Sequence, residues 1–234
     1  MNKPIIGTDL SNWQGKPDFD KLAAANIEFA ISKACDGMNV TSTFASDWDN
    51  SKGKLIRGAY TWFYPEKDWR AQADKFLATV GTLDPTDMPL AIDFEQPTKI
   101  VGAPLLKMVT DYVRYLSENT GRKPLLYTGK WYWQQYVQDL DAPELIELCD
   151  LWHAEYPRTS AHGTQYEATL AELKSPHPAK PWADRNIEPV IWQFDGDKGL
   201  TLPDGTDADF NRYNGTIEEF QAWVASTILP PVCQ

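Results

Sequence analysis

Asp93 and Glu95 are two acids separated by one residue near the end of the segment MPLAIDFEQ, residues 88–96. This apolar run, bounded by a turn-rich segment and by Pro97, predicts a buried strand. Both side chains would project to the same side, with Cα atoms roughly 6.5 Å apart. Two carboxyls this close favour one protonated and one ionised group, the pair that glycoside hydrolysis requires. The alternative is a pair of strand-end acids that face water or hold a surface cation.

Other polar and aromatic side chains also fall at the ends of expected strands. They are Asp9, Tyr60, Trp62, Tyr127, Trp152, Trp192 and Asp209. Each alone has an ordinary explanation: Asp9 could be a strand-end cap, Asp209 a loop acid like Asp207, and the tryptophans core residues. A carboxylate cluster could also bind Ca²⁺ or Mg²⁺, but aromatic surroundings are unusual for such an ion, so we expect neither a metal nor another cofactor.

Strands and helices alternate along the chain at intervals of roughly 25–35 residues, which is typical of βα units around a parallel sheet. The expected strands cover residues 5–10, 27–34, 56–63, 88–96, 123–129, 149–155 and 190–195, with a further short element at 206–211. Seven or eight such strands would close into a single irregular, flattened, TIM-like β/α barrel. Chemistry in such barrels sits at the C-terminal ends of the strands, where the acids and rings converge.

Helical patterns fill the intervals between these strands. They are expected at 18–25, 44–54, 68–80, 105–116, 131–138 and 216–226, the last with a capping box of Thr216 and Glu219. Residues 157–189 have no clear period beyond a turn of helix at 166–173, and we interpret them as a substrate-side loop. We therefore expect one catalytic domain over residues 1–228 and a tail over 229–234.

Composition excludes several classes of function. The net charge of −11 and the absence of a basic cluster argue against a nucleic-acid partner. The sequence has no apolar stretch long enough to span a bilayer, and its N-terminal residues lack the apolar centre of a signal peptide. The three cysteines and three histidines show no metal-binding spacing. We therefore expect free thiols, no membrane insertion and a protein that is at first cytoplasmic.

The ordered motifs resemble glycoside hydrolase family 25, the Chalaropsis-type lysozymes found among phage endolysins and bacterial autolysins. They are GTDLSNWQG (7–15), SKACDG (32–37), GAYTW (58–62), IDFE (92–95), LYT (126–128), LWHAEY (151–156), IWQF (191–194) and DADFN (207–211). Each block is weak alone, but the ordered set is specific. The resemblance implies a muramidase that cleaves the β-1,4 bond after N-acetylmuramic acid in peptidoglycan. We expect the protein to bind a glycan strand of peptidoglycan and to be a monomer.

The resemblance also implies roles for single residues. Glu95 matches the proton donor and Asp93 its partner carboxylate, while Asp9 and Asp209 match further acids of the cleft. Tyr60 matches a tyrosine of the same site, and Trp62, Tyr127, Trp152 and Trp192 are expected to contact sugar. We expect retention of configuration, with Asp93 either attacking the anomeric carbon or orienting the acetamido group of the substrate.

Some positions depart from the family pattern and bear on substrate preference more than on the reaction. Asn12 stands where His is common, Thr61 and Trp62 replace His-Phe, Cys35 and Asp36 replace Thr-Glu, and His153 occupies a usually aliphatic position. A chitinase-like hydrolase and a non-catalytic glycan-binding barrel are the rival interpretations. A phage endolysin that waits in the cytoplasm before reaching the cell wall fits best, with a secreted autolysin as the alternative.

Overall fold

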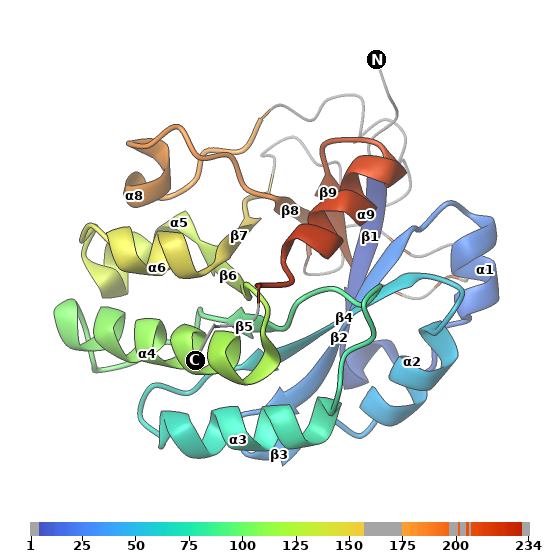
Figure 1. The fold of residues 1–234 in the computed structure, drawn as a ribbon, viewed down its shortest axis with the longest axis horizontal. Helices are drawn as coiled ribbons and strands as arrows, with labels where there is room; N and C mark the ends of the chain where they lie inside the picture. The colour runs from blue at the N-terminus through green and yellow to red at the C-terminus, as the bar shows by residue number, and fades with distance from the viewer. Residues whose placement is uncertain (1–4, 157–174, 197–200, 202–204, 206, 231–234) are drawn as a thin grey trace.

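Eight strands close into a mixed β-barrel in the computed structural model, which describes residues 5–156, 175–196, 201, 205 and 207–230 (Figure 1). Around the ring they are β1 (Ile5–Leu10), β9 (Asp209–Tyr213), β8 (Ile191–Asp195), β7 (Asp150–Ala154), β6 (Leu125–Gly129), β5 (Ala91–Asp93), β4 (Ile56–Trp62) and β2 (Phe29–Asp36). The parallel pairing of β1 with β2 completes the ring, and the short β3 (Asn39–Val40) extends β2 as a hairpin. The predicted β/α barrel is confirmed.

The expectation that the whole sheet is parallel is wrong for the short β3, which is antiparallel to β2, and for one strand of the barrel. β9 runs antiparallel to both β8 and β1. Within the described residues, no helix crosses over between β8 and β9, and a parallel connection needs a crossover of that kind. Consequently Asp209, the first residue of β9, lies at the same rim as the last residues of the parallel strands.

Helices surround the barrel (Figure 1). The longer ones are α1 (Phe19–Ala24), α2 (Phe44–Ser51), α3 (Trp69–Val80), α4 (Ala103–Thr120), α6 (Pro143–Leu148) and α9 (Ile217–Ser226). Single turns occur at η1 (Asn12–Gln14), α5 (Lys130–Tyr132) and α8 (Lys180–Ala183), and the π-helical turn η2 (Trp133–Val137) follows α5. The sequence patterns did not predict α6 and α8, and the turn expected at 166–173 lies outside the described residues.

Local signals explain where the best-predicted helices begin and end. Helix α4 carries Pro104 in its first turn and ends at Gly121, whose φ of 63° is the left-handed conformation that glycine adopts without strain. Helix α9 begins with the predicted capping box, in which Thr216 and Glu219 exchange side-chain and backbone hydrogen bonds.

The barrel interior is filled by apolar side chains below the rim. Phe29, Ile31 and Leu125 belong to one buried cluster, and Phe220 of α9 joins it with its ring 4.9 Å from that of Phe29. Gly7 on β1 leaves space for the Phe29 ring, because a Cβ atom at this position would overlap it. Helix α9 therefore closes the end of the barrel at which the parallel strands begin.

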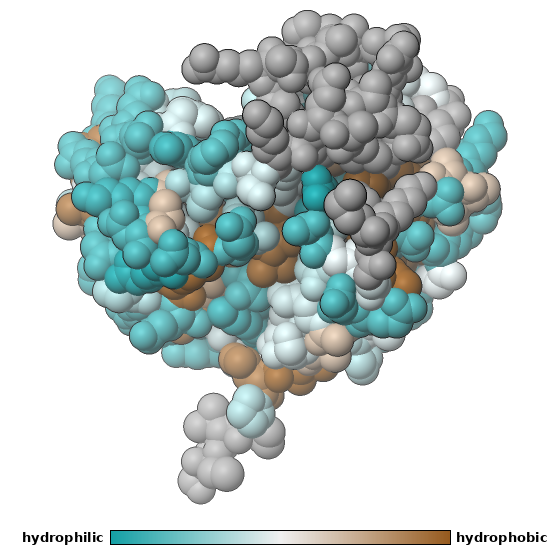
Figure 2. Space-filling view, turned by 90° about the horizontal axis from the view of Figure 1, so that it is seen from above, coloured by the Kyte–Doolittle hydropathy of each residue, from teal (hydrophilic) through white to brown (hydrophobic). Residues whose placement is uncertain are grey.

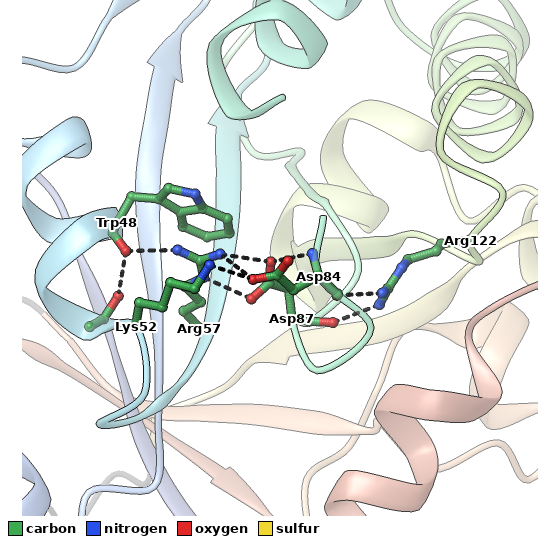
Figure 3. Close-up of polar contacts among 7 residues, drawn as sticks. Trp48, Lys52, Arg57, Asp84, Asp87 and Arg122 are labelled. Atoms are coloured by element: carbon green, nitrogen blue, oxygen red, sulfur yellow. Dashed lines mark hydrogen bonds and ion pairs between the residues drawn. The ribbon is translucent and has the colours of Figure 1, made fainter. Parts of the chain in front are cut away.

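A buried charge network stabilises that same end (Figure 3). The Arg57 guanidinium donates to both carboxylate oxygens of Asp87, at 2.7 and 3.1 Å, and lies 4.0 Å from the centre of the Trp48 ring. Arg122 donates to the backbone oxygens of Asp84 and Asp87 at 2.7 and 2.6 Å. The network fixes the turn before β5 to the beginning of β4 and to the segment before β6.

The outer surface is mainly hydrophilic on the face that Figure 2 shows, where hydrophobic residues form small, separate areas. Among the described residues, no helix has the length and apolar character needed to cross a membrane. Cys35 and Cys149 are buried free thiols.

Candidate active site

A cavity of about 1040 Å³ lies at the rim where the parallel strands end. The residues predicted from sequence that line it are Asp9, Tyr60, Trp62, Glu95, Tyr127 and Asp209. They come from four strands of the barrel (β1, β4, β6 and β9) and the segment after β5, so their convergence depends on ring closure. The cavity is large enough for sugar rings and opens at the end of the barrel where β/α barrels carry their chemistry.

The two acids of the IDFE motif occupy different environments. Asp93 is the last residue of β5 and is only 5% exposed, whereas Glu95 follows the strand, is half-buried and lines the cavity. Oδ1 of Asp93 accepts no hydrogen bond from any described residue. Glu95 can therefore reach a bound ligand directly, and Asp93 supports the wall behind it.

Hydrogen bonds hold the backbone on both sides of Glu95. The Phe94 amide donates to the Tyr127 carbonyl at 2.9 Å, and the Thr128 hydroxyl donates to the Phe94 carbonyl at 3.0 Å. After Glu95, the Tyr132 hydroxyl donates to the Gln96 carbonyl at 2.9 Å. This bracing limits the movement of Glu95 relative to the barrel, as expected of a group that must transfer a proton with defined geometry.

Burial raises the pKa of Asp93 well above its ordinary value, and the neighbouring charge of Glu95 raises it further. The Lys33 ammonium acts in the opposite direction. Lys33 also lies 4.8 Å from the centre of the Trp62 ring and 5.8 Å from that of Tyr60, so it forms part of the cavity wall. The site holds a proton among its acids more readily than free carboxyls would.

Asp9 and Asp209 form a second pair of acids across the rim. They are direct partners in the antiparallel register of β1 and β9. Oδ1 of Asp9 accepts hydrogen bonds from the side-chain amides of Gln193, at 3.0 Å, and Asn211, at 2.6 Å. Burial raises the pKa of Asp9, while these amide donors lower it.

Two tyrosines complete the floor between the acid pairs. Burial raises the pKa of Tyr60 well above its ordinary value, with further increases from the charges of Asp9 and Asp93. Burial also raises the pKa of Tyr127 well above normal, and its hydroxyl donates to Gln193 Oε1 at 2.8 Å. Both hydroxyls therefore stay protonated at neutral pH and can act as hydrogen-bond donors.

The family model described as "Glycosyl hydrolases family 25" matches residues 8–199, which include Asp9, Asp93 and Glu95 but not Asp209. The chain belongs to this family. It is therefore a glycoside hydrolase. The acids that converge at the rim agree with this, because glycoside hydrolysis uses a pair of carboxyl groups.

Known proteins resemble this family 25 hydrolase in sequence or in fold over much of its length. YegX of Escherichia coli (strain K12) is 29% identical over 227 residues, which are 94% of this chain and 73% of YegX. The N,O-diacetylmuramidase of Arthroderma benhamiae is 32% identical over 141 residues, 56% of this chain and 60% of that protein. The bacterial lysozyme from Streptomyces coelicolor has a TM-score of 0.78 at 21% identity, over 97% of this chain and 100% of that one, and shares its fold.

Two tryptophans that were expected to contact sugar, Trp152 and Trp192, do not line the cavity. Trp152 is 1% exposed and donates to Asn211 Oδ1 at 2.7 Å, with its ring edge against Tyr60 and Tyr127, so it lies beneath the floor of the cavity. Trp192 precedes Gln193 and so projects to the opposite face of β8, where it packs with the cluster outside the barrel. Neither belongs to the described lining, so we do not propose sugar contacts for them.

Other lining residues were not predicted as part of the site. Trp13 and Trp131 are 85% and 48% exposed and border the cavity from η1 and α5. Their positions in turns directly after β1 and β6 are the signal that could have singled them out, because such turns form the rim of a β/α barrel.

Glu155 forms a further part of the wall and joins the two chain segments on either side of 157–174. Its carboxylate accepts from the His177 backbone amide, lies 3.1 Å from His177 Nδ1 and lies 3.5 Å from Nε2 of the buried His153. Burial alone would raise the pKa of Glu155, but the hydrogen bonds from His153 and His177 prevail and lower it to about 2. Within the described ranges, no group of three or more His, Cys, Asp or Glu has the geometry to hold a metal ion.

Proposed function

We propose that this chain is a muramidase that hydrolyses the β-1,4 bond between N-acetylmuramic acid and N-acetylglucosamine in peptidoglycan. The observation that carries the proposal is the placement of Glu95 on the cavity wall, with Asp93 buried two residues earlier at the end of β5. The muramidase of Arthroderma benhamiae, which is 32% identical over 56% of this chain, supports the choice of substrate.

Glu95 acts as the general acid on the glycosidic oxygen and then as the general base for water. Its position on the cavity wall allows it to contact the scissile bond, and the hydrogen bonds around Phe94 and Gln96 keep it in place. Proton transfer of this kind typically contributes a factor of about 10²–10⁴ to the rate. The oxygen of the leaving sugar receives the proton as its bond to the anomeric carbon breaks.

Asp93 supports the positive charge that develops at the reacting centre. It is buried and outside the described cavity lining, which favours orientation of the substrate acetamido group over direct attack on the anomeric carbon. In the first case the acetamido oxygen forms the bond to the anomeric carbon, and water then opens the resulting ring. Both routes retain the configuration of the anomeric carbon.

Tyr60, Trp62 and Tyr127 lie on the floor and wall of the cavity and would contact the sugar rings. Tyrosine and tryptophan combine an apolar face with a hydrogen-bond donor, which suits a carbohydrate. We expect the enzyme to act on cell-wall glycan as a monomer. The cell wall is then its place of action, whatever route brings the protein there.

Digestion of purified peptidoglycan tests this function. A muramidase releases fragments with a new reducing end on N-acetylmuramic acid, which mass spectrometry after borohydride reduction identifies, and NMR of the first product shows the retained anomer. New reducing ends on N-acetylglucosamine, or equal cleavage of chitin, would instead indicate the chitinase-like alternative. Binding to peptidoglycan without any new reducing end would indicate a non-catalytic glycan-binding barrel.

A further inference from the structure

The side-chain amides of Gln193 and Asn211 face the Asp9 and Asp209 pair with a defined orientation. Oε1 of Gln193 accepts from the hydroxyls of Tyr127 and Tyr156, both at 2.8 Å. With its oxygen facing the two hydroxyls, Gln193 turns its amide nitrogen towards the acids, whose oxygens accept from it. It lies 3.0 Å from Asp9 Oδ1 and 3.4 Å from Asp209 Oδ2.

Asn211 is oriented by the same logic from the opposite side. Its Oδ1 accepts from the Trp152 indole nitrogen at 2.7 Å, and an indole N–H can only donate. The Asn211 amide nitrogen therefore donates to Asp9 Oδ1, at 2.6 Å. Gln193 and Asn211 are themselves paired in the register of β8 and β9 and are buried. Two amide N–H groups thus converge on one oxygen of Asp9, which favours the ionised form of that carboxyl.

Asp209 lies opposite Asp9 on the neighbouring strand. It is the antiparallel partner of Asp9, and the Gln193 amide nitrogen contacts both carboxyls, at 3.0 Å from Asp9 and 3.4 Å from Asp209. Two carboxyl groups in this position can bond to each other only if one of them holds a proton, because two carboxylates have only acceptors. Like charges directly opposite each other on a sheet are also unfavourable, and more so where water is excluded. Asp9 is only 7% exposed.

We propose that Asp9 and Asp209 share one proton in the resting enzyme, that Asp209 carries it, and that Gln193 and Asn211 are positioning residues that keep Asp9 ionised. This inference rests on the proposed function only where it concerns activity. It gives the two acids different roles: Asp9 supplies a fixed negative charge below the sugar, whereas Asp209 is a neutral acid that can donate a hydrogen bond to a hydroxyl or carbonyl oxygen of the substrate.

Isosteric amides distinguish these roles, because Asn mimics a neutral, proton-bearing Asp. Asp209→Asn should lower kcat/KM on peptidoglycan by less than about tenfold, whereas Asp9→Asn should lower it by about a hundredfold or more. An Asp209→Asn variant that is as damaged as Asp9→Asn, or more so, overturns the assignment. Both substitutions conserve shape, and thermal unfolding shows whether each variant is folded.

A pH profile tests the positioning residues. Gln193→Met removes the amide donor, which makes Asp9 easier to protonate, so kcat/KM should fall about tenfold against wild type at the acidic end and converge towards it at higher pH. The titratable groups facing Asp9 are Asp209 of β9, Asp93 and Glu95 at β5, Tyr60 of β4, Tyr127 of β6 and Lys33 of β2. A loss that is uniform over pH means that Gln193 has only a structural role and overturns its part of the proposal.

Gln72→Met is the matched control for that experiment. Gln72 is also a fully buried amide, but it bonds the Tyr64 backbone, outside the acid cluster. Its substitution should lower the unfolding temperature and leave the pH profile unchanged.

Carbon-13 NMR of protein labelled at the aspartate carboxyls tests the proton assignment without substrate. The signals are assigned by their loss in Asp9→Asn and Asp209→Asn. At neutral pH the Asp209 carbon should have the shift of a protonated carboxyl and the Asp9 carbon that of a carboxylate; any other distribution overturns the inference. Because this measurement needs no cleavage, it is independent of whether the chain proves to be a muramidase.

Discussion

Glu95 lines the cavity while Asp93, two residues earlier at the end of β5, is buried behind it. The strand ends at Asp93, and the cavity lining includes Glu95 but not Asp93. One carboxyl is thus available to exchange protons with substrate, and the other is held in a poorly hydrated place where its charge acts on whatever binds above. The first two predictions follow from this difference.

Glu95→Gln should lower kcat on peptidoglycan by about a thousandfold, because the amide cannot donate or accept the transferred proton. Initial rates of reducing-end release check this expectation. The unfolding temperature should remain near that of the wild type, since Glu95 is only half-buried. A variant that digests the substrate at a near-native rate would falsify the assignment of Glu95.

Asp93→Asn should make the protein more stable at neutral pH, although activity is lost. In the folded protein the pKa of Asp93 is raised from 3.8, so its ionised form costs stability above the folded-state pKa, and this cost disappears as the pH falls towards 3.8. The variant should therefore unfold several degrees higher at pH 7 and match the wild type near pH 4, at about 2–4 °C for each kcal/mol.

Differential scanning calorimetry across this pH range measures the effect. Asp20→Asn serves as the control, because the Asp20 side chain is 76% exposed and its ion pair with Lys54 contributes little. Equal or lower stability of Asp93→Asn at pH 7 would contradict the raised pKa.

Trp13→Ala and Trp131→Ala should each raise KM for long glycan strands about three- to tenfold, with less effect on kcat, because exposed rings at the rim can stack on sugars beyond the reacting bond. Kinetics on long and short fragments would show the difference. Ile228→Ala removes another exposed apolar side chain, after α9 at the opposite end of the barrel, and should leave KM unchanged. If KM is unaffected in both tryptophan variants, these rings do not bind glycan.

Arg57→Met should destabilise the fold by about 3–5 kcal/mol, since it leaves Asp87 buried without its cation. The unfolding temperature should fall by about 10 °C. Lys52→Met removes an exposed ion pair with Asp84 from the same network and should cost less than about 1 kcal/mol. KM of the folded Arg57→Met enzyme should equal that of wild type; a changed KM would show that the network influences the cavity.

The parts of the fold that sequence predicted are those with local causes. The apolar period of α4 together with Pro104 and Gly121, and the apolar run that becomes β5, needed no knowledge of distant residues, although β5 covers only Ala91–Asp93 of the strand expected over 88–96. The direction of β9 could not be predicted in this way. Strand direction depends on how the chain returns to the ring, and the residues of a strand carry little information about it.

The tryptophans show the same limit at the site. Trp152 and Trp192 lie on neighbouring strands, but which face of each strand looks into the barrel, and how deeply, is decided by closure of the ring. Lys33 was missed because a charged residue within a strand is usually solvated; here it lies over the rings of Tyr60 and Trp62. Gln193 and Asn211 belong to the IWQF and DADFN motifs, yet the orientation of their amides follows only from the donors around them.

Strand β4 carries Arg57 near its beginning and Trp62 at its end, roughly 16 Å apart for a strand of this length. Substitutions this far apart usually combine additively. Thermal tolerance and glycan preference can therefore be altered by separate sets of substitutions, one at each end of the ring. A lineage could acquire a new cell-wall target by changing the rim alone and inherit its heat resistance intact.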